Sequence, residues 1–151
     1  MPTITVARRF AAPADDVWRY VRWHGVAQLA HYAEAYFEKI TFETVEEVVG
    51  AIKTIYPFDG DPIIERLEEL NVAERTYRYR LLDNGGLPIT DYTGYVRVTP
   101  AGPHACFLKI ECNFTPVDVS AEQWEATWRD MENGMMDEIE LKLHPVAAAA
   151  E

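Results

Sequence analysis

The sequence predicts an α+β fold in which a curved antiparallel sheet of six to seven strands surrounds one long C-terminal helix. Two patterns support this prediction. Residues from about 36 to 115 alternate between apolar and polar side chains, as strands with one buried face do. Residues 120–143 instead repeat apolar side chains every three or four positions, as one face of a helix does. Both apolar faces are buried if the helix lies in the concave side of the sheet, and the space between them is an internal cavity.

A strand and a short helix open the chain. Residues 3–11 alternate in the manner of a strand. A helix start is expected within residues 11–21, because Pro13 suits the first helical position. Asp15 and Asp16 follow it and favour the positive end of the helix dipole.

A second short helix and the sheet come next. We expect Gly25 to end the first helix and residues 26–33 to form the second. Turn signals then divide the strand region at residues 57–62, 72–74, 83–86 and 100–103. The predicted order is therefore one strand, two short helices, about six strands and the last helix.

The last helix has a clear start and a continuous apolar stripe. Ser120 and Gln123 form the capping box S-x-x-Q, and Pro145 follows the expected end. The stripe consists of Trp124, Trp128, Met131, Met135, Ile139 and Leu143. We expect these side chains to cover the sheet and to form one wall of the cavity.

The composition restricts the classes of function. The chain has 151 residues, and we expect a single domain over residues 1–145 with a disordered tail at 146–151. A net charge of −11 argues against nucleic acid and anionic membrane surfaces as partners, because both would be repelled. No apolar run reaches the roughly 20 residues of a membrane helix, and the N-terminal residues lack a signal-peptide core.

The cysteines and histidines favour a reducing compartment and argue against a metal site. On one strand, Cys106 and Cys112 would lie about 20 Å apart at roughly 3.3 Å per residue, too far for a disulfide. Two free thiols fit the cytoplasm. The four histidines show no spacing with the cysteines that is typical of metal ligands, so no metal is expected.

One predicted hairpin carries charges where side chains should face inward. Lys53 precedes the turn, and Glu65 follows it on the same strand face as Ile63 and Leu67. The centre of the turn decides whether residue 53 pairs with 65 or with 66, and the sequence leaves both registers open. In the first register, burial would lower the pKa of the lysine and raise that of the glutamate, so either could exchange protons near neutral pH. The alternative is a structural ion pair that holds the hairpin.

Several segments resemble the helix-grip superfamily, which includes START domains, Bet v 1 allergens and bacterial polyketide cyclase/dehydrase and lipid-transport-like proteins. These segments, in order, are APADDVW, VGAIKT, ERLEEL, YRYRLL, LPITDYTGYVRVTP and the C-terminal helix. A shorter pattern, V-G-x-x-[RK] followed by E-R-L and [DN]-Y, more distantly resembles plant abscisic-acid receptors. The loop PFDGDP is shorter than the gate loop of those receptors and lacks its sequence, so a hormone-receptor role is not transferred.

The resemblance implies that the inward residues of these strands and of the helix line a ligand cavity. His24 is added because it could reach the cavity mouth as an acid or base. The candidate catalytic residues are Glu65, Lys53 and Tyr92. The candidate ligand-binding residues are Ile63, Leu67, Tyr77, Tyr79, Gly94, Ile110, Met131, Met135, Ile139 and His24.

Such a set suits aldol-type cyclisation or dehydration of a poly-β-keto or other aromatic precursor, without a cofactor. We therefore expect a cytoplasmic biosynthetic enzyme, similar to cyclases and dehydratases, that encloses a small hydrophobic or aromatic molecule. The alternative is a non-catalytic carrier or sensor of a lipid or aromatic metabolite. A third class is a partner-binding module in which ligand closes the loops at 57–62 and 84–89. A homodimer is left open.

Overall fold

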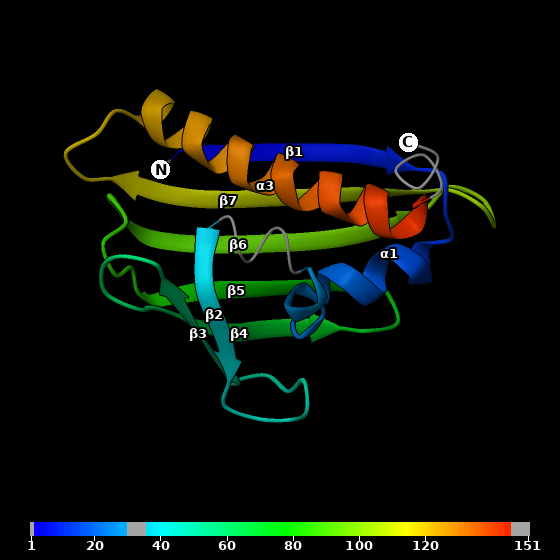
Figure 1. Ribbon diagram of the computed structural model, residues 1–151, viewed down its shortest axis with the longest axis horizontal. Helices are drawn as coiled ribbons and strands as arrows, with labels where there is room; N and C mark the ends of the chain where they lie inside the picture. Colours follow the sequence, from blue (N-terminus) through cyan, green and yellow to red (C-terminus); the bar gives the residue numbers. More distant parts are fainter. Residues whose placement is uncertain (1, 30–35, 146–151) are drawn as a thin grey trace.

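The computed structural model describes residues 2–29 and 36–145, and it places seven antiparallel strands in one sheet (Figure 1). The strand order is β1-β7-β6-β5-β4-β3-β2. The strands are β1 (Thr3–Phe10), β2 (Phe37–Phe42), β3 (Ile52–Pro57), β4 (Ile63–Asn71), β5 (Thr76–Asp83), β6 (Ile89–Pro100) and β7 (Cys106–Pro116). The helices are α1 (Ala14–Val21), the 3-10 helix η1 (Gly25–Gln28) and α3 (Ala121–Leu143).

The long helix lies across the concave face of the sheet, as predicted. In Figure 1, α3 crosses in front of β7 and β6, and β2 turns out of the sheet so that it passes in front of β5. Trp128 and Ile139 of α3 and Leu108 of β7 are fully buried in the core between these layers. The predicted α+β architecture is therefore confirmed, with seven strands around one long C-terminal helix.

The boundaries of α1 differ from the prediction. Pro13 is the residue before the first helical position and caps α1 without a side-chain hydrogen bond. The helix ends before Arg22, three residues earlier than expected. Gly25 opens η1 instead of closing α1. A Cβ atom at Gly25 would lie 2.3 Å from the carbonyl oxygen of Arg19, so the close approach of the two segments requires glycine.

The second predicted helix is shorter than residues 26–33. The structure has the single turn η1 at Gly25–Gln28, because its hydrogen bonds follow the tighter i→i+3 pattern and end at Leu29. Residues 30–33 of that prediction lie outside the described residues, as does the predicted tail at 146–151.

The capping box predicted at the start of α3 is confirmed. Ser120 Oγ accepts a hydrogen bond from the backbone N–H of Gln123 at 3.1 Å, and the Gln123 side chain accepts one from the Ser120 N–H at 2.8 Å. Cys106 and Cys112 both lie on β7 as free, buried thiols, which confirms that they do not pair.

A bulge in β6 determines which of its side chains face the core. The pairing of β6 with β7 shifts between Thr90 and Thr93, and Asp91 has a positive φ of 53°. The extra residue lets Ile89 and Tyr92 both be buried although they are three positions apart. The bulge therefore places Tyr92 on the concave face without losing the anchor at Ile89.

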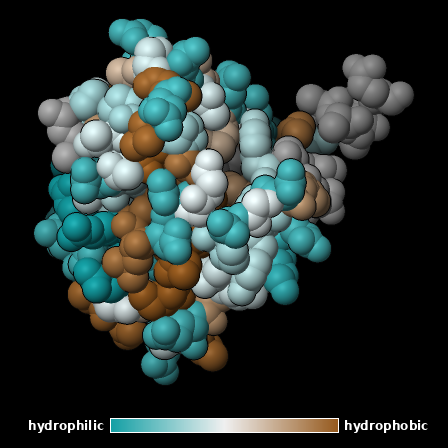
Figure 2. Space-filling model, turned by 90° about the vertical axis from the view of Figure 1, so that its left-hand side faces the viewer, coloured by the Kyte–Doolittle hydropathy of each residue, from teal (hydrophilic) through white to brown (hydrophobic). Residues whose placement is uncertain are grey.

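Figure 2 views the molecule from the end at which the β3–β4 and β5–β6 connections lie, and apolar residues form a band on this face. The exposed apolar side chains include Phe58 on the β3–β4 connection, Leu82 near the end of β5 and Val117 on the loop before α3. No helix in the described part of the chain is long and apolar enough to cross a membrane.

Candidate functional site

A cavity of about 110 Å³ lies between the concave face of the sheet and α3. An engineered protein cavity of about 150 Å³ holds benzene, so this cavity has room for a molecule of about that size or smaller. Most of the wall is apolar and comes from the sheet, the β5–β6 loop and α3; its members include Ile40, Ile55, Ile63, Leu81, Leu87, Met131 and Met135. A small group of polar side chains also lines the cavity.

The first polar pair is Lys53 of β3 and Glu65 of β4. The two residues are direct cross-strand partners, which resolves the register that the sequence left open. Lys53 Nζ lies 3.9 Å from Glu65 Oε1 and 4.0 Å from the centroid of the Trp23 ring. Both side chains are buried, and both line the cavity.

Burial is the main influence on the pKa values of this pair. It lowers the pKa of Lys53, while the charge of Glu65 acts in the opposite direction. Burial likewise raises the pKa of Glu65, and the Lys53 charge acts against that rise. Both groups are therefore shifted toward the pH range in which proton transfer at neutral pH becomes feasible.

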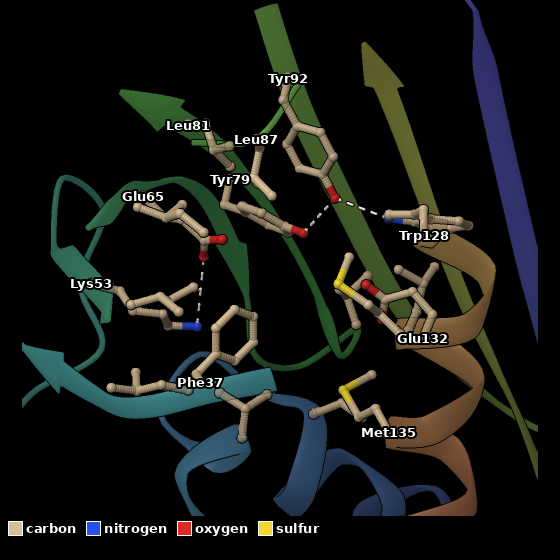
Figure 3. Close-up of a pocket in the computed structure, with 18 of the residues that line it drawn as sticks. Phe37, Lys53, Glu65, Tyr79, Leu81, Leu87, Tyr92, Trp128, Glu132 and Met135 are labelled. Atoms are coloured by element: carbon tan, nitrogen blue, oxygen red, sulfur yellow. Dashed lines mark hydrogen bonds and ion pairs between the residues drawn. The ribbon is translucent and has the colours of Figure 1, made fainter. Parts of the chain in front are cut away.

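A third ionisable group, Glu132 of α3, faces this pair from the other side of the cavity (Figure 3). It is 8% exposed and lies one helical turn after Trp128. Burial raises its pKa to about 8, the charge of Glu65 adds to the rise, and the charge of Lys53 opposes it. At neutral pH, Glu132 therefore holds a proton that it can donate.

These three ionisable groups share an unusual lack of direct partners. Within residues 2–29 and 36–145, neither Lys53, Glu65 nor Glu132 makes a side-chain hydrogen bond, and the 3.9 Å ion pair is the nearest charged contact among them. Buried polar groups are nearly always hydrogen-bonded in folded proteins. Their donors and acceptors are thus left for a molecule inside the cavity.

A chain of neutral hydrogen-bonding groups runs between the two charged walls. The Trp128 Nε1–H donates to Tyr92 Oη at 3.1 Å, and Tyr92 Oη lies 3.0 Å from Tyr79 Oη. Burial raises the pKa of both tyrosines well above the usual value, so both remain neutral phenols. The bond between the two hydroxyls uses one of their two hydrogens. The Tyr92 hydroxyl also interacts with the Cys112 thiol, and both tyrosines line the cavity.

Gly94 supports this chain from behind and does not line the cavity itself. It is paired with Tyr79 across β6 and β5. A Cβ atom at Gly94 would lie 2.2 Å from the Tyr79 ring, so the ring can lie against β6 only because this position is glycine.

The structure brings most of the predicted site residues together. The candidates that line the cavity are Lys53, Glu65, Tyr92, Ile63, Tyr77, Tyr79, Ile110, Met131 and Met135. Leu67 and Ile139 are fully buried in the core beside the cavity and do not line it. The Tyr77 hydroxyl is used structurally, because it donates to the Val21 carbonyl at 2.8 Å.

His24 lies outside this cavity, in an open groove on the surface. Its backbone N–H donates to Glu47 at 2.8 Å, and its Nε2 lies 3.0 Å from the Thr44 carbonyl oxygen. Arg22 also pairs with Glu47, at 2.8 Å. His24 therefore joins the end of α1 to the loop between β2 and β3.

Sequence reasoning missed Glu132, Trp128 as a hydrogen-bond donor, and Leu87 as a wall residue. A signal for Glu132 was present. It lies four residues after Trp128 and three before Met135, which places a carboxyl group on the apolar stripe of the helix. A charged residue at such a position is either paired or functional. Within the described residues, no cluster of three or more His, Cys, Asp or Glu side chains could hold a metal ion.

Comparison with known proteins identifies the type of fold and the family. A sequence model described as "Polyketide cyclase / dehydrase and lipid transport" matches residues 1–151. Norcoclaurine synthase from Thalictrum flavum is a structural neighbour with a TM-score of 0.73 at 23% identity, over 95% of this chain and 87% of that one. Its similarity establishes the Bet v 1-like helix-grip fold that the sequence predicted.

Bacterial proteins have the same fold. The protein XoxI from Bacillus cereus has a TM-score of 0.72 at 22% identity, over 94% of this chain and 95% of that one. A Bacillus thuringiensis protein described as putative and uncharacterized has a TM-score of 0.70 at 21% identity, over 92% and 96% of the two chains. The search of curated proteins found no match.

Proposed function

Because the chain belongs to the polyketide cyclase / dehydrase and lipid transport family, we propose that it binds a small carbonyl compound in its cavity and catalyses cofactor-independent dehydration or cyclisation of it. The observation that carries the proposal is the convergence of Lys53, Glu65 and Glu132 on one apolar cavity, with their hydrogen-bonding capacity unused by the described residues. Perturbed ionisable groups in a cleft are typical of sites of proton transfer.

Dehydration of a β-hydroxy ketone illustrates the roles. Glu65 removes a proton from the carbon that lies between the carbonyl group and the hydroxyl-bearing carbon. A phenol hydroxyl of the Tyr79–Tyr92 pair donates a hydrogen bond to the carbonyl oxygen as negative charge develops there. Glu132 then protonates the departing hydroxyl, which leaves as water. The positive charge of Lys53 stabilises the ionised carboxylate of Glu65 and so limits the energetic penalty of ionising it inside the protein.

The positions of Glu132 and Glu65 support their assignment as acid and base. Glu132 comes from α3 and the Lys53–Glu65 pair from β3 and β4, so the two sets of groups approach a ligand from opposite sides (Figure 3). A mechanism in which a proton leaves one atom while another atom gains one requires such a separation. Tyr92 and Tyr79 lie on the sheet between the two sets of groups.

The size of the cavity supports a small substrate. Sites for drug-sized ligands usually measure about 300–1,000 Å³, well above the 110 Å³ found here. A long acyl chain or a multi-ring polyketide does not fit this volume. The proposal is accordingly restricted to short-chain or single-ring carbonyl compounds, and lipid cargo is not part of it.

Turnover of a small panel of β-hydroxy ketones, beginning with 4-hydroxy-2-butanone, tests the proposal through the ultraviolet absorbance of the enone product. The purified protein should accelerate water loss, and Glu132→Gln should reduce the rate by about 100-fold while ligand affinity changes little. Glu138→Gln is the matched control, because Glu138 is equally buried on α3 but lies outside the cavity.

The competing function is a carrier or sensor that binds the same compounds without changing them. The unused hydrogen-bonding groups would then serve only to orient the ligand. Equal turnover by the parent and by Glu132→Gln would refute the catalytic role of Glu132. Binding measured by calorimetry, with no acceleration over buffer for any member of the panel, would favour the carrier or sensor.

A further inference from the structure

We propose that Lys53 is a nucleophile that forms a Schiff base with small aldehydes and ketones inside the cavity. The inference rests on the proposed function, because it assumes that the ligand is a small carbonyl compound. It adds a covalent step and a specific reacting atom, Lys53 Nζ.

The surroundings of Lys53 Nζ are those of an available amine. The residue is 4% exposed, yet its Nζ has no hydrogen-bond acceptor among the described residues and lies 3.9 Å from Glu65. The ring of Trp23 lies on one side of it at 4.0 Å, and the side chain lines the cavity. A buried lysine that was purely structural would be expected to use its donors on carbonyl or carboxylate oxygens.

Two other lysines of the chain are more exposed than Lys53 and lie near carboxylates. Lys109 on β7 forms an ion pair with Glu111 at 3.0 Å, and its side chain is 45% exposed. Lys142 lies near the end of α3 and is exposed, 4.0 Å from Glu138. These side chains provide an internal standard for the reactivity of an ordinary lysine.

The charge environment supports nucleophilic character. Burial lowers the pKa of Lys53, which increases the fraction of neutral amine at neutral pH. The carboxylates of Glu65, Glu47 and Glu132 oppose this shift and so limit it. Glu132 weakens that opposition while it holds its own proton.

The site holds the groups needed for each proton of the reaction. The Nζ lone pair of the neutral amine forms a bond to the carbonyl carbon, and the carbonyl oxygen takes a proton from Glu132. Glu65 then takes one proton from the nitrogen and passes it to the hydroxyl, which leaves as water when the C–O bond breaks. The remaining proton on the nitrogen passes to the Glu132 carboxylate, which restores that acid and leaves the neutral imine. The net change is one amine and one carbonyl converted to one imine and one water, with no oxidation or reduction.

The apolar wall favours the imine over the free reactants. Imine formation releases water, and a cavity of about 110 Å³ lined mainly by aliphatic and aromatic side chains leaves little room for that water beside a bound ligand. The same volume selects the ligand, since an aldehyde with a short chain fills it whereas a longer one does not.

Reductive trapping tests the inference on the intact protein. The parent chain is incubated with butanal and sodium cyanoborohydride at pH 7, and the rate of butylation at each lysine is followed by peptide mapping. We expect Lys53 to be modified at least about tenfold faster than Lys109 and Lys142 in the same sample, because exposed lysines are almost wholly protonated at this pH. Equal or slower modification of Lys53 would overturn the inference.

A variant of Glu132 tests whether fast trapping at Lys53 depends on the proposed acid or only on the access of the reagent to Lys53. Glu132→Gln should slow trapping at Lys53 by about tenfold or more and leave the rates at Lys109 and Lys142 unchanged. The control Glu138→Gln should leave the rates at Lys53 and Lys109 unchanged; Lys142 is not used in this comparison, because it lies 4.0 Å from Glu138. Unaltered trapping at Lys53 in Glu132→Gln would remove Glu132 from the step.

The trapping result and the turnover result can fail independently. Dehydration of 4-hydroxy-2-butanone without preferential trapping at Lys53 would refute the Schiff base and leave the proposed proton-transfer function standing. Trapping at Lys53 without any dehydration would support the Schiff base and count against the proposed function.

Discussion

Lys53 and Glu65 are direct partners across β3 and β4, yet their charged atoms stay 3.9 Å apart and both face the cavity. At that separation the charges attract, but no direct hydrogen bond satisfies either group. Each charge therefore makes the burial of the other tolerable while both remain available to a ligand. This relationship underlies the proposed chemistry.

Removing Lys53 should destabilise the protein in a pH-dependent way. In Lys53→Met, Glu65 loses the charge that lowers its pKa, so its ionised form becomes more costly to bury. We expect a loss of about 3 kcal/mol in the free energy of unfolding at pH 8 and a smaller loss at pH 5, because the raised pKa of Glu65 makes its neutral form more populated at the lower pH. Urea unfolding at the two pH values measures this.

The double variant Lys53→Met/Glu65→Leu is the control for that experiment. Replacing both members of a buried ion pair by apolar side chains is often neutral or stabilising. The double variant should recover most of the lost stability. A double variant as unstable as Lys53→Met would contradict the coupling of the two groups.

Glu132→Gln should make the protein more stable at alkaline pH. A carboxyl whose pKa rises from 4.5 to about 8 on folding holds more protons in the folded state, so stability falls as pH rises between these values. The full difference corresponds to about 5 kcal/mol. Glutamine has no such proton, so the variant should gain stability relative to the parent as pH increases from 5 to 9.

Chemical denaturation across that pH range checks the expectation, with Glu138→Gln as the control variant on the same helix. The gap between parent and Glu132→Gln should widen with pH, and by more than any change in the gap between parent and Glu138→Gln. A gap that stays constant from pH 5 to pH 9 would mean that Glu132 is ionised throughout.

Gly94→Ala should displace Tyr79. The added methyl group would lie 2.2 Å from the Tyr79 ring, so the ring must move away from β6 and break its bond to Tyr92. Overpacking of this kind costs about 1–3 kcal/mol. Thermal unfolding should show the loss, and Gly86→Ala is the matched control because its position is open. An unchanged melting temperature in Gly94→Ala would show that Tyr79 is free to relocate.

Tyr92→Phe should be more harmful to stability than Tyr79→Phe. Removing the Tyr92 hydroxyl leaves the buried Trp128 N–H without its acceptor and also breaks the bond to Tyr79. An unsatisfied buried donor costs about 1–3 kcal/mol, whereas a single lost hydrogen bond costs about 1 kcal/mol. Urea unfolding of both variants compares them. If Tyr79→Phe proved the more unstable of the two, the bond from the Trp128 N–H to Tyr92 would not make the contribution to stability described here.

The fold could be predicted because it follows from patterns that span many residues. Period-two alternation and one long helical stripe each involve a whole element, so small errors at the ends do not change the architecture. The boundaries of α1 and η1 could not be predicted in the same way. They depend on the close contact between Gly25 and the Arg19 carbonyl, which is a tertiary feature.

The site could be predicted in part. Lys53 and Glu65 interrupt strand alternation, so their inward position was visible in the sequence, but their register depended on the geometry of one turn. Glu132 was overlooked because a glutamate is common on helices, and its burial is decided by how closely α3 approaches the sheet. The sequence predicts that His24, beside the second short helix, can reach the cavity mouth, and the structure places it in the surface groove instead.

A carbon-13 NMR titration of the glutamate side-chain carboxyls measures the state of Glu132 most directly. Its signal is assigned by its disappearance in Glu132→Gln. We predict a midpoint at about pH 8, which would show that the cavity holds a proton donor at neutral pH. A midpoint near 4.5, the ordinary value for glutamate, would show an ionised and solvated carboxyl and would contradict the proposed role in proton transfer.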